Sequence, residues 1–241
     1  MNTNMNKIEV TDNSKNKAAR LSGFFYLILA ITGTFTFFVK EKLIVYGDPQ
    51  VTAMNISSSE LLFLISIVSE LIMASSWILI AIALYKVFQK INNLMAVLML
   101  TLVSVGGAII YINVTCQIAS LIILKNATGY LATFNTNQIQ SLAMLFLDIS
   151  KESVYANYLF MGLWMFPFAF FVYKSRYFPR IISQIWSVLL IIGGLGYITD
   201  FFTYFLLPDI FIAISRFAFG GDLFSIFWLL IMGVKASNKG Q

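Results

Sequence analysis

The run LLFLISIVSELIMASSWILIAIALY, residues 61–85, decides the fold of this chain. It is apolar over the length of a membrane span and carries one charged residue, Glu70, well inside it. Apolar runs of about 18 or more residues with almost no charge are typical of transmembrane helices. A carboxyl group inside such a helix is costly to bury and normally faces the protein interior or a water-filled cavity. The run therefore predicts a membrane helix and marks Glu70 as a candidate functional residue.

The composition extends this prediction to the whole chain. Hydrophobic residues make up 59% of the 241 residues and charged residues 11%, against roughly 45–50% and 25% in soluble domains. With no histidine and a single cysteine, Cys116, the chain offers neither a disulfide framework nor the usual zinc or haem ligands. We therefore expect no metal and no cofactor. The polar ends of the chain have no nucleic-acid-binding pattern, so the expected partners are membrane lipids and a small or cationic ligand.

The pattern of apolar segments predicts an all-α bundle of six transmembrane helices. Pro167 lies inside the fourth helix and predicts a kink between Leu163 and Pro167. Residues 138–150 have helical amphipathic spacing, which predicts a short helix in the membrane interface before the fourth span. The six predicted spans are residues 21–39, 61–85, 94–124, 153–173, 185–207 and 215–234.

The six spans and their connections, residues 21–235, are expected to form a single membrane domain. We expect residues 1–20 to be a disordered tail outside the bilayer and residues 236–241 to be a second tail. Residues 40–60 are expected to form a loop, with a turn at Gly47-Asp48-Pro49.

The distribution of Lys and Arg predicts the orientation. If both termini are cytoplasmic, 11 of the 16 Lys and Arg residues lie on the cytoplasmic side, and only five lie on the other side. Positive charge concentrates in cytoplasmic loops. We therefore expect six spans with both chain ends in the cytoplasm.

Five buried polar side chains are predicted to share one depth, in the outer half of the bilayer. At 1.5 Å per residue, each lies about 10 to 16 Å below the outer end of its helix. Small residues recur on the same helix faces, as expected where helices pack closely. The five residues are Glu70, Asn113, Gln117, Asp200 and Asp222.

Two interpretations of this polar layer stay open. The five side chains could act only as interhelical hydrogen-bonding groups, a common role for Asn and Gln in membranes. Alternatively, because intramembrane carboxyls mark functional sites and three like charges would repel, some carboxyls keep their protons and the layer binds a proton or a cation.

Several longer motifs resemble a known family of bacterial membrane proteins, the domain of unknown function number 4386. The resemblance runs from about residue 20 to residue 235. The motifs that carry it, together with Asn113, are GDPQVTAMNISSSELLF (47–63), ALYKVFQKINNLMAVLM (83–99), LFLD (145–148), GLW with Pro167 (162–167), VYKSRYFPR (172–180), GGLGYITDFFTYFLLPD (193–209) and GDLFSIFWLLIMGVK (221–235).

The resemblance implies a helical bundle in the bacterial cytoplasmic membrane, without an established activity. This chain departs from the family pattern at two places. Asp222 stands where the family favours Glu, which keeps a carboxyl group. Ile149 and Ser150 follow LFLD where the family often has a His, which argues against a metal-based or His-based mechanism.

Three functions are consistent with the sequence, and only the third is enzymatic. The first is binding or transport of a proton, cation, or small or lipid-like ligand at an outward-facing acidic pocket. The second is a helper subunit of a membrane complex. The third is an intramembrane aspartyl hydrolase using Asp200 and Asp222, although the flanking residues fit the known protease signature poorly. The sequence does not indicate an oligomeric state.

Overall fold

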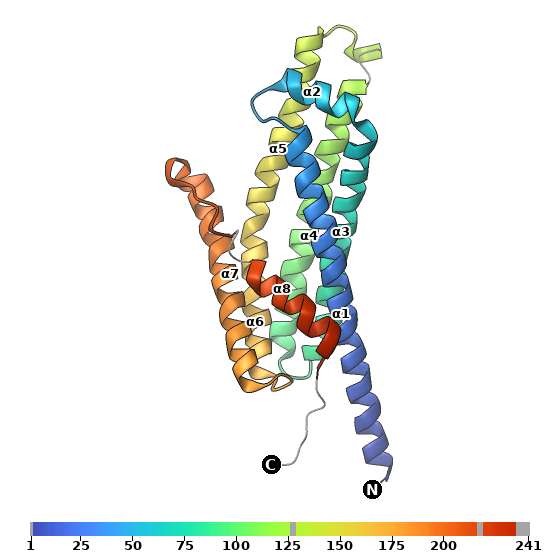
Figure 1. Cartoon of the computed structure of the whole chain (residues 1–241), viewed down its shortest axis with the longest axis vertical. Helices are drawn as coiled ribbons and strands as arrows, with labels where there is room; N and C mark the ends of the chain where they lie inside the picture. Colours follow the sequence, from blue (N-terminus) through green and yellow to red (C-terminus); the bar gives the residue numbers. More distant parts are fainter. Residues whose placement is uncertain (1, 126–128, 216–218, 235–241) are drawn as a thin grey trace. The chain divides into compact units, whose positions relative to one another are not determined.

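The computed structural model describes residues 2–125, 129–215 and 219–234, and these residues contain helices and no strands (Figure 1). The predicted tail at residues 236–241 lies outside the described residues. The helices are α1 (Asn2–Leu43), α2 (Pro49–Ser58), α3 (Glu60–Phe88), α4 (Asn93–Lys125), α5 (Thr136–Leu163), α6 (Met165–Lys174), α7 (Arg180–Leu206) and α8 (Phe219–Phe227), with short helical turns η1 (Gly129–Leu131), η2 (Pro208–Ile210) and η4 (Trp228–Met232).

Five of the described helical stretches are long and apolar enough to cross a membrane. They lie in α1, α3, α4, α5 with α6, and α7, and they confirm the predicted helical bundle. The sixth predicted span, residues 215–234, overlaps a shorter apolar helix, Gly220–Met232. Residues 216–218 lie outside the described residues, so the count of six spans stays a prediction.

The chain divides into two compact units. That residues 21–235 form a single membrane domain stays a prediction. Unit 1 contains Met1–Ile28, Ser76–Gly106 and Tyr158–Gln241, and unit 2 contains Leu29–Ser75 and Gly107–Asn157. Helices α1, α3, α4 and α5 therefore contribute one part to each unit. The two units are described separately below.

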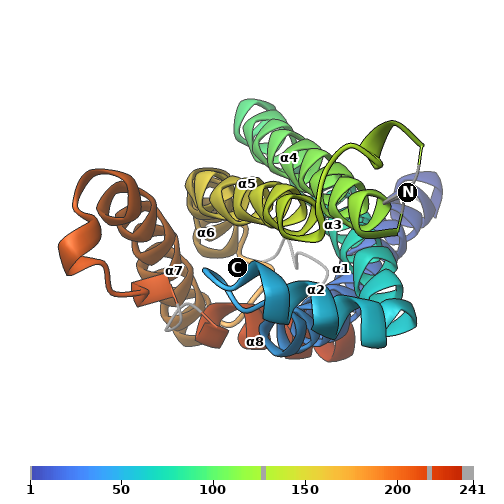
Figure 2. The same ribbon diagram turned by 90° about the horizontal axis from the view of Figure 1, so that it is seen from above.

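Unit 1 has an aromatic core. The buried Trp186 contacts Phe168 edge-on, with ring centroids 5.6 Å apart, and Phe178 at 4.9 Å. Helices α6 and α7 lie side by side (Figures 1 and 2), and α5 meets α7 through two glycines. A Cβ atom added to Gly162 would lie 2.6 Å from the carbonyl oxygen of Gly194, so this contact requires a residue without a side chain.

Unit 2 packs around an apolar cluster next to a group of buried polar side chains. The cluster joins the end of α1 to α2, α3, α4 and α5, and its buried members include Leu43, Ile56, Phe63, Leu121 and Leu147. α2 is tied to the end of α1 by the Thr52 hydroxyl, which bonds both the N–H and the C=O of Val45. The polar group is described in the next subsection.

The connection at residues 40–60 is more ordered than predicted. The turn is present, with Gly47 at a φ of +89°, which favours glycine. It leads directly into α2 instead of a loop. The Asp48 carboxylate accepts a hydrogen bond from the Val51 N–H at 3.0 Å, and Pro49 is the first helical residue. An Asp N-cap followed by Pro at the first position is a helix-start pattern, and it is visible in the sequence.

The interfacial helix predicted at residues 138–150 is not a separate element. α5 runs without a break from Thr136 to Leu163. The sequence between the two predicted elements, Ser150-Lys151-Glu152-Ser153, contains neither Gly nor Pro, so nothing in it ends a helix. The helix begins with a capping box, in which Asn135 and Gln138 form reciprocal side-chain to backbone bonds of 2.9 and 3.0 Å.

The kink predicted near Pro167 is confirmed. α5 ends at Leu163 and α6 begins at Met165, with Trp164 between them. Proline has no N–H to bond the carbonyl four residues earlier, and this carbonyl belongs to Leu163.

In the structure α1 begins at Asn2, ahead of the predicted first span. That residues 1–20 form a disordered tail stays a prediction. Side chains from this part bind other segments of unit 1. Asn16 Oδ1 accepts a bond from the Val234 N–H at 3.2 Å, and Lys15 Nζ lies 3.1 Å from the Tyr177 hydroxyl. These partners are more than 150 residues away along the chain, so composition alone could not predict them.

Candidate functional site

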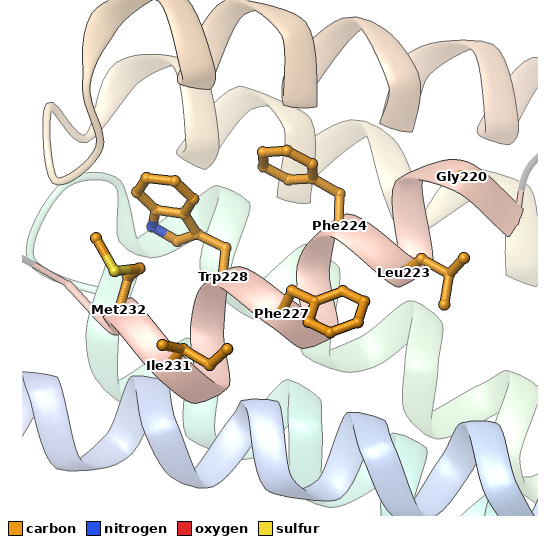
Figure 3. Close-up of a pocket in the computed structure, with 7 residues that line it drawn as sticks. All are labelled: Gly220, Leu223, Phe224, Phe227, Trp228, Ile231 and Met232. Carbon is orange, nitrogen blue, oxygen red and sulfur yellow. The ribbon is translucent and has the colours of Figure 1, made fainter.

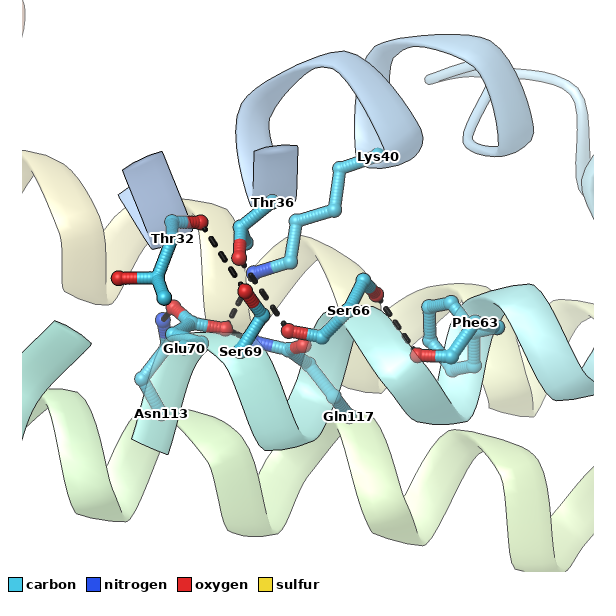
Figure 4. A network of polar contacts seen from close by, with 9 residues as sticks. All are labelled: Thr32, Thr36, Lys40, Phe63, Ser66, Ser69, Glu70, Asn113 and Gln117. Atoms are coloured by element: carbon cyan, nitrogen blue, oxygen red, sulfur yellow. Dashed lines mark hydrogen bonds and ion pairs between the residues drawn. The ribbon is translucent and has the colours of Figure 1, made fainter. Parts of the chain in front are cut away.

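Three helices of unit 2 each contribute two polar residues one turn apart. Residues at i and i+4 lie on the same helix face. α1 contributes Thr36 and Lys40, α3 contributes Ser66 and Glu70, and α4 contributes Asn113 and Gln117. The three faces meet in one polar centre, which we define by Lys40, Glu70, Asn113 and Gln117 (Figure 4).

Glu70 is at the middle of this polar centre, with 3% of its surface exposed. Its Oε2 lies 2.5 Å from Lys40 Nζ and accepts a hydrogen bond from Gln117 Nε2 at 2.8 Å. Its Oε1 accepts a hydrogen bond from Asn113 Nδ2 at 3.1 Å. One carboxylate thus joins α1 to α4 through α3.

Backbone contacts around the polar centre hold α1 against α3. The Thr36 hydroxyl donates to the Ser66 carbonyl at 3.3 Å, and the Ser69 hydroxyl donates to the Thr32 carbonyl at 3.2 Å. Helices α1 and α3 therefore have little freedom to slide along each other. These bonds set the position of the Lys40 backbone along the helix axis relative to Glu70.

The charges in the polar centre cancel. Removing one charge from water costs several kcal/mol, and a close opposite charge with further hydrogen bonds offsets much of this cost. The Glu70 side chain is 5% exposed and the Lys40 side chain 19%. Lys40 lies three residues before the end of α1, and its long side chain places the ammonium group on the buried Glu70 carboxylate.

Two acceptor atoms in the polar centre have no donor. Asn113 and Gln117 are 1% and 0% exposed, and both turn their NH₂ groups toward Glu70. Their side-chain oxygens, Oδ1 and Oε1, are consequently buried without a hydrogen-bond partner. Leaving a buried acceptor unpaired costs about 1–3 kcal/mol. A cation or a donor group placed beside these oxygens would remove that cost.

The structure brings together three of the five predicted site residues, and Asp200 and Asp222 belong to unit 1. Glu70, Asn113 and Gln117 form direct hydrogen bonds within unit 2. That all five line a common cavity stays a prediction.

Asp200 binds backbone in unit 1. Its Oδ1 accepts a bond from the Ile214 N–H at 2.7 Å, and its Oδ2 accepts one from the Ser215 N–H at 2.8 Å. After α7 ends at Leu206, the chain folds back along that helix, and Ser215 packs 3.5 Å from the Cβ position of Gly196. Backbone outside a helix needs polar partners in an apolar environment. The carboxylate of Asp200 supplies two of them.

Asp222 lies in the first turn of α8, where the helix dipole favours a negative charge. The predicted span placed its start near Ser215, but the backbone N–H of Ser215 is bound by Asp200 instead.

Lys40 is the site residue that the sequence interpretation missed. It directly follows the apolar run that ends at Val39 and was assigned to the loop. The signal was its spacing of four residues from Thr36, which extends the polar face of the first span by one turn. A lysine at the end of a span can reach back into it with its long side chain.

The two grooves that the structure shows most clearly are apolar, and neither contains a predicted site residue. One has a volume of about 550 Å³ and lies along α8, where Phe224, Phe227, Trp228 and Ile231 line it (Figure 3). The other has a volume of about 370 Å³ and lies between α6 and α7. They do not support the predicted acidic pocket.

Within the described ranges, no group of three His, Cys, Asp or Glu side chains is close enough to hold a metal ion. Glu70 is the only acid in the polar centre as defined above. The centre therefore offers one carboxylate oxygen pair and two amide oxygens, a set without soft or nitrogen ligands.

These features define a polytopic α-helical membrane protein with an ion pair between helices of unit 2. The chain belongs to the family described as Domain of unknown function (DUF4386), whose model matches residues 21–233. This confirms the resemblance found in the sequence.

A relative from the archaeon Archaeoglobus fulgidus, described as an uncharacterized protein, is 34% identical over 82 residues. The match covers 34% of this chain and 47% of the relative, so it spans about half of the relative's length. No solved structure matches the chain. The bacterial origin and the cytoplasmic membrane implied by the resemblance stay predictions.

Proposed function

We propose that the protein binds a proton or a small cationic or hydroxyl-bearing ligand at the polar centre of unit 2. The observation that carries this proposal is the pair of buried, unpaired oxygens, Asn113 Oδ1 and Gln117 Oε1, beside the Glu70 carboxylate. A polar group that served only to join helices would be expected to satisfy its own acceptors. Acceptors left open at full burial are suited to a guest that brings donors or positive charge.

The buried ion pair alone does not carry the proposal. Buried salt bridges often contribute little net stability compared with apolar residues of similar size. Lys40 and Glu70 could therefore be a structural pair that only fixes the register of α1 and α3. The two unpaired amide oxygens favour a binding role over a purely structural role, because a structural ion pair does not use them.

The hydrolase alternative is not favoured by the surroundings of Asp200. Both of its carboxylate oxygens accept backbone N–H bonds, which hold the group against the segment that follows α7. A shared-proton dyad needs one carboxyl that exchanges its proton during the reaction. We assign Asp200 a positioning role for residues 207–215 instead.

The test is the retention of a ligand by variants that lack the open oxygens. Asn113→Leu and Gln117→Met keep the approximate side-chain volumes and the Lys40–Glu70 pair. Protein extracted with its native lipids would be compared with wild type by native mass spectrometry. We expect a bound non-lipid mass in wild type and its loss in both variants.

Ser120→Ala is the matched control, because Ser120 is buried on the same helix and bonds only the Gln117 carbonyl within it. If the ligand is a proton, no mass is retained. In that case the pH dependence of the unfolding temperature should differ between wild type and Asn113→Leu. A pH profile and a bound mass that are the same in all four proteins would contradict the proposal.

A further inference from the structure

We propose that Lys40 is a tethered cation that occupies the ligand position, and that the ligand is a monovalent metal ion, Na⁺ or K⁺, which binds when Lys40 withdraws. This rests on the proposed function and names its ligand class. The polar centre would then have two states, one closed by Lys40 and one holding the ion. The argument has three steps, from charge, from geometry and from the exposure of Lys40.

The first step is charge. The polar centre contains one carboxylate, and its only cation is the Lys40 ammonium group. The two charges sum to zero. If a monovalent ion enters and Lys40 leaves as an ammonium ion, the sum is again zero. A divalent ion would leave an uncompensated positive charge at a site that is almost fully buried, which is strongly unfavourable.

The second step is geometry. A carboxylate offers about four acceptor positions, and three of those on Glu70 are used, one of them by Lys40. Withdrawal of Lys40 frees a position on Oε2, next to the donor of Gln117. Carboxylate and amide carbonyl oxygens are the ligands that hard cations prefer. In the closed state the NH₂ groups of Asn113 and Gln117 face Glu70. Half a turn of each carboxamide exchanges its NH₂ group for its oxygen, so Glu70, Asn113 and Gln117 can then supply three ligands from two helices.

The third step is the unequal burial of the two partners. The side chain of Lys40 is 19% exposed, whereas that of Glu70 is 5% exposed. Lys40 also lies one turn from the end of α1, and the next lysine on this helix, Lys42, is exposed. Because Lys40 lies at the end of its span, we expect its long side chain to carry the ammonium group toward the membrane surface by rotation about its own bonds. The backbones of Glu70, Asn113 and Gln117 keep their positions well inside α3 and α4, and only the two carboxamide groups turn.

The first experiment measures the unfolding temperature of the purified protein in detergent as NaCl or KCl replaces choline chloride at constant ionic strength. Choline is a monovalent cation too large to enter. We expect stabilisation by Na⁺ or K⁺ over choline in wild type. Lys40→Met removes the competing charge, so the same stabilisation should appear at a concentration at least about tenfold lower, which corresponds to 1.4 kcal/mol.

Lys42→Met is the matched control, because it removes an equivalent charge two residues away on an exposed position. It should respond as wild type does. The double variant Lys40→Met/Glu70→Gln should show no difference between Na⁺, K⁺ and choline. If Lys40→Met and Lys42→Met respond at the same concentration, or if choline stabilises as well as the metal ions, the exchange does not occur.

A second measurement uses wild type alone and stays informative if Lys40→Met does not fold. An amine-acetylating reagent is applied in choline chloride, in NaCl and in KCl, and the modification of each lysine is followed by peptide mass spectrometry. We expect Na⁺ or K⁺ to speed acetylation of Lys40, because the ion displaces its ammonium group, and to leave Lys42 unchanged. An equal rate for Lys40 in the three salts would overturn the proposal.

The results separate this inference from the proposed function. If Asn113→Leu changes the pH profile or loses a bound molecule, but alkali ions neither stabilise the protein nor release Lys40, the site binds something other than a metal ion. The function then stands and the ligand class is wrong. If no ligand-dependent or pH-dependent property changes in Asn113→Leu or Gln117→Met, both are wrong.

Discussion

Each oxygen of Glu70 has a different set of neighbours, and this determines what its replacement does. Glu70→Gln removes the charge that balances Lys40 and puts an NH₂ group near the amide donors of Asn113 and Gln117. The presence of Lys40 means that this substitution destabilises the protein whether or not a ligand binds. A stability measurement on Glu70→Gln alone therefore cannot separate a structural role from a binding role.

A double-mutant cycle at Lys40 and Glu70 isolates the pair. We expect each single variant, Lys40→Met and Glu70→Gln, to lower the free energy of unfolding by about 3 kcal/mol, because one buried charge or its partner is left uncompensated. The double variant should lose clearly less than the sum, since no charge remains. Chemical unfolding in mixed micelles measures the three values. Additive losses would show that the two side chains do not interact.

A second residue-scale prediction concerns Asp200. Asp200→Asn replaces one of two accepting oxygens by an NH₂ group that faces a backbone N–H, so we expect a loss of about 1–3 kcal/mol in unfolding free energy. Hydrogen exchange at Ile214 and Ser215 should become faster, while exchange within α3 stays unchanged. Asp209→Asn, at an exposed residue of the same connection, is the control and should change neither property.

At the scale of the helices, the contact between α5 and α7 depends on two glycines. A Cβ atom on Gly162 would lie 2.6 Å from the Gly194 carbonyl oxygen and 2.7 Å from Ile198 Cγ1. Backbone cannot give way as a flexible side chain can, so Gly162→Ala should separate the helices and lower the unfolding free energy by about 1–3 kcal/mol.

Gly220→Ala is the control for this prediction. A Cβ atom at Gly220 meets no other atom within 4 Å. Because alanine favours helix over glycine, this variant should be neutral or slightly stabilising. The unfolding temperatures of both variants, measured in the same detergent, test the prediction. Equal values would show that α5 and α7 tolerate a wider spacing.

The sequence predicted the helices well where apolar runs are long and end in turn residues. The spans at 61–85 and 94–124 agree with α3 and α4 within three residues at each end. The prediction of a separate interfacial helix at residues 138–150 was wrong, because an amphipathic pattern and an apolar pattern can follow each other in one helix. In the last predicted span the described helix begins later than predicted, at Phe219, because the predicted start was obtained by counting back a standard length.

Part of the candidate site could also be predicted from the sequence. Glu70, Asn113 and Gln117 could be found because polar residues within apolar runs are conspicuous. Lys40 was overlooked because a lysine at the end of a span normally lies at the membrane surface. Its spacing of four residues from Thr36 places it on the polar face of α1, and the contact with Glu70 shows that it belongs to the site. Similarly, a carboxylate such as Asp200 that binds backbone N–H groups has no sequence pattern that separates it from one that binds a ligand.

At the scale of the whole molecule, the orientation in the membrane is a prediction from charge. Positive residues favour the cytoplasmic side, so the loop before α4 should be cytoplasmic and the loop before α5 should face outward. In a protein whose Cys116 is replaced, Thr133→Cys should react with a membrane-impermeant maleimide in intact cells. Asn93→Cys should react only after the cells are opened. Both positions are exposed, so access to the reagent is set by the membrane alone. The opposite labelling pattern would reverse the orientation.

The bonds between the start of α1 and the end of the chain set an order of events during synthesis. Arg20 binds the carbonyl of Ile231 and Asn16 binds the N–H of Val234, across separations of 211 and 218 residues. At a translation rate of 5–20 residues per second, α1 leaves the ribosome roughly 10 to 40 seconds before these partners exist. During this interval the insertion machinery holds a first helix whose polar groups have no permanent partners. A chain released early, without its last eleven residues, lacks both Ile231 and Val234, so it should keep that unfinished surface and become a substrate for membrane proteases.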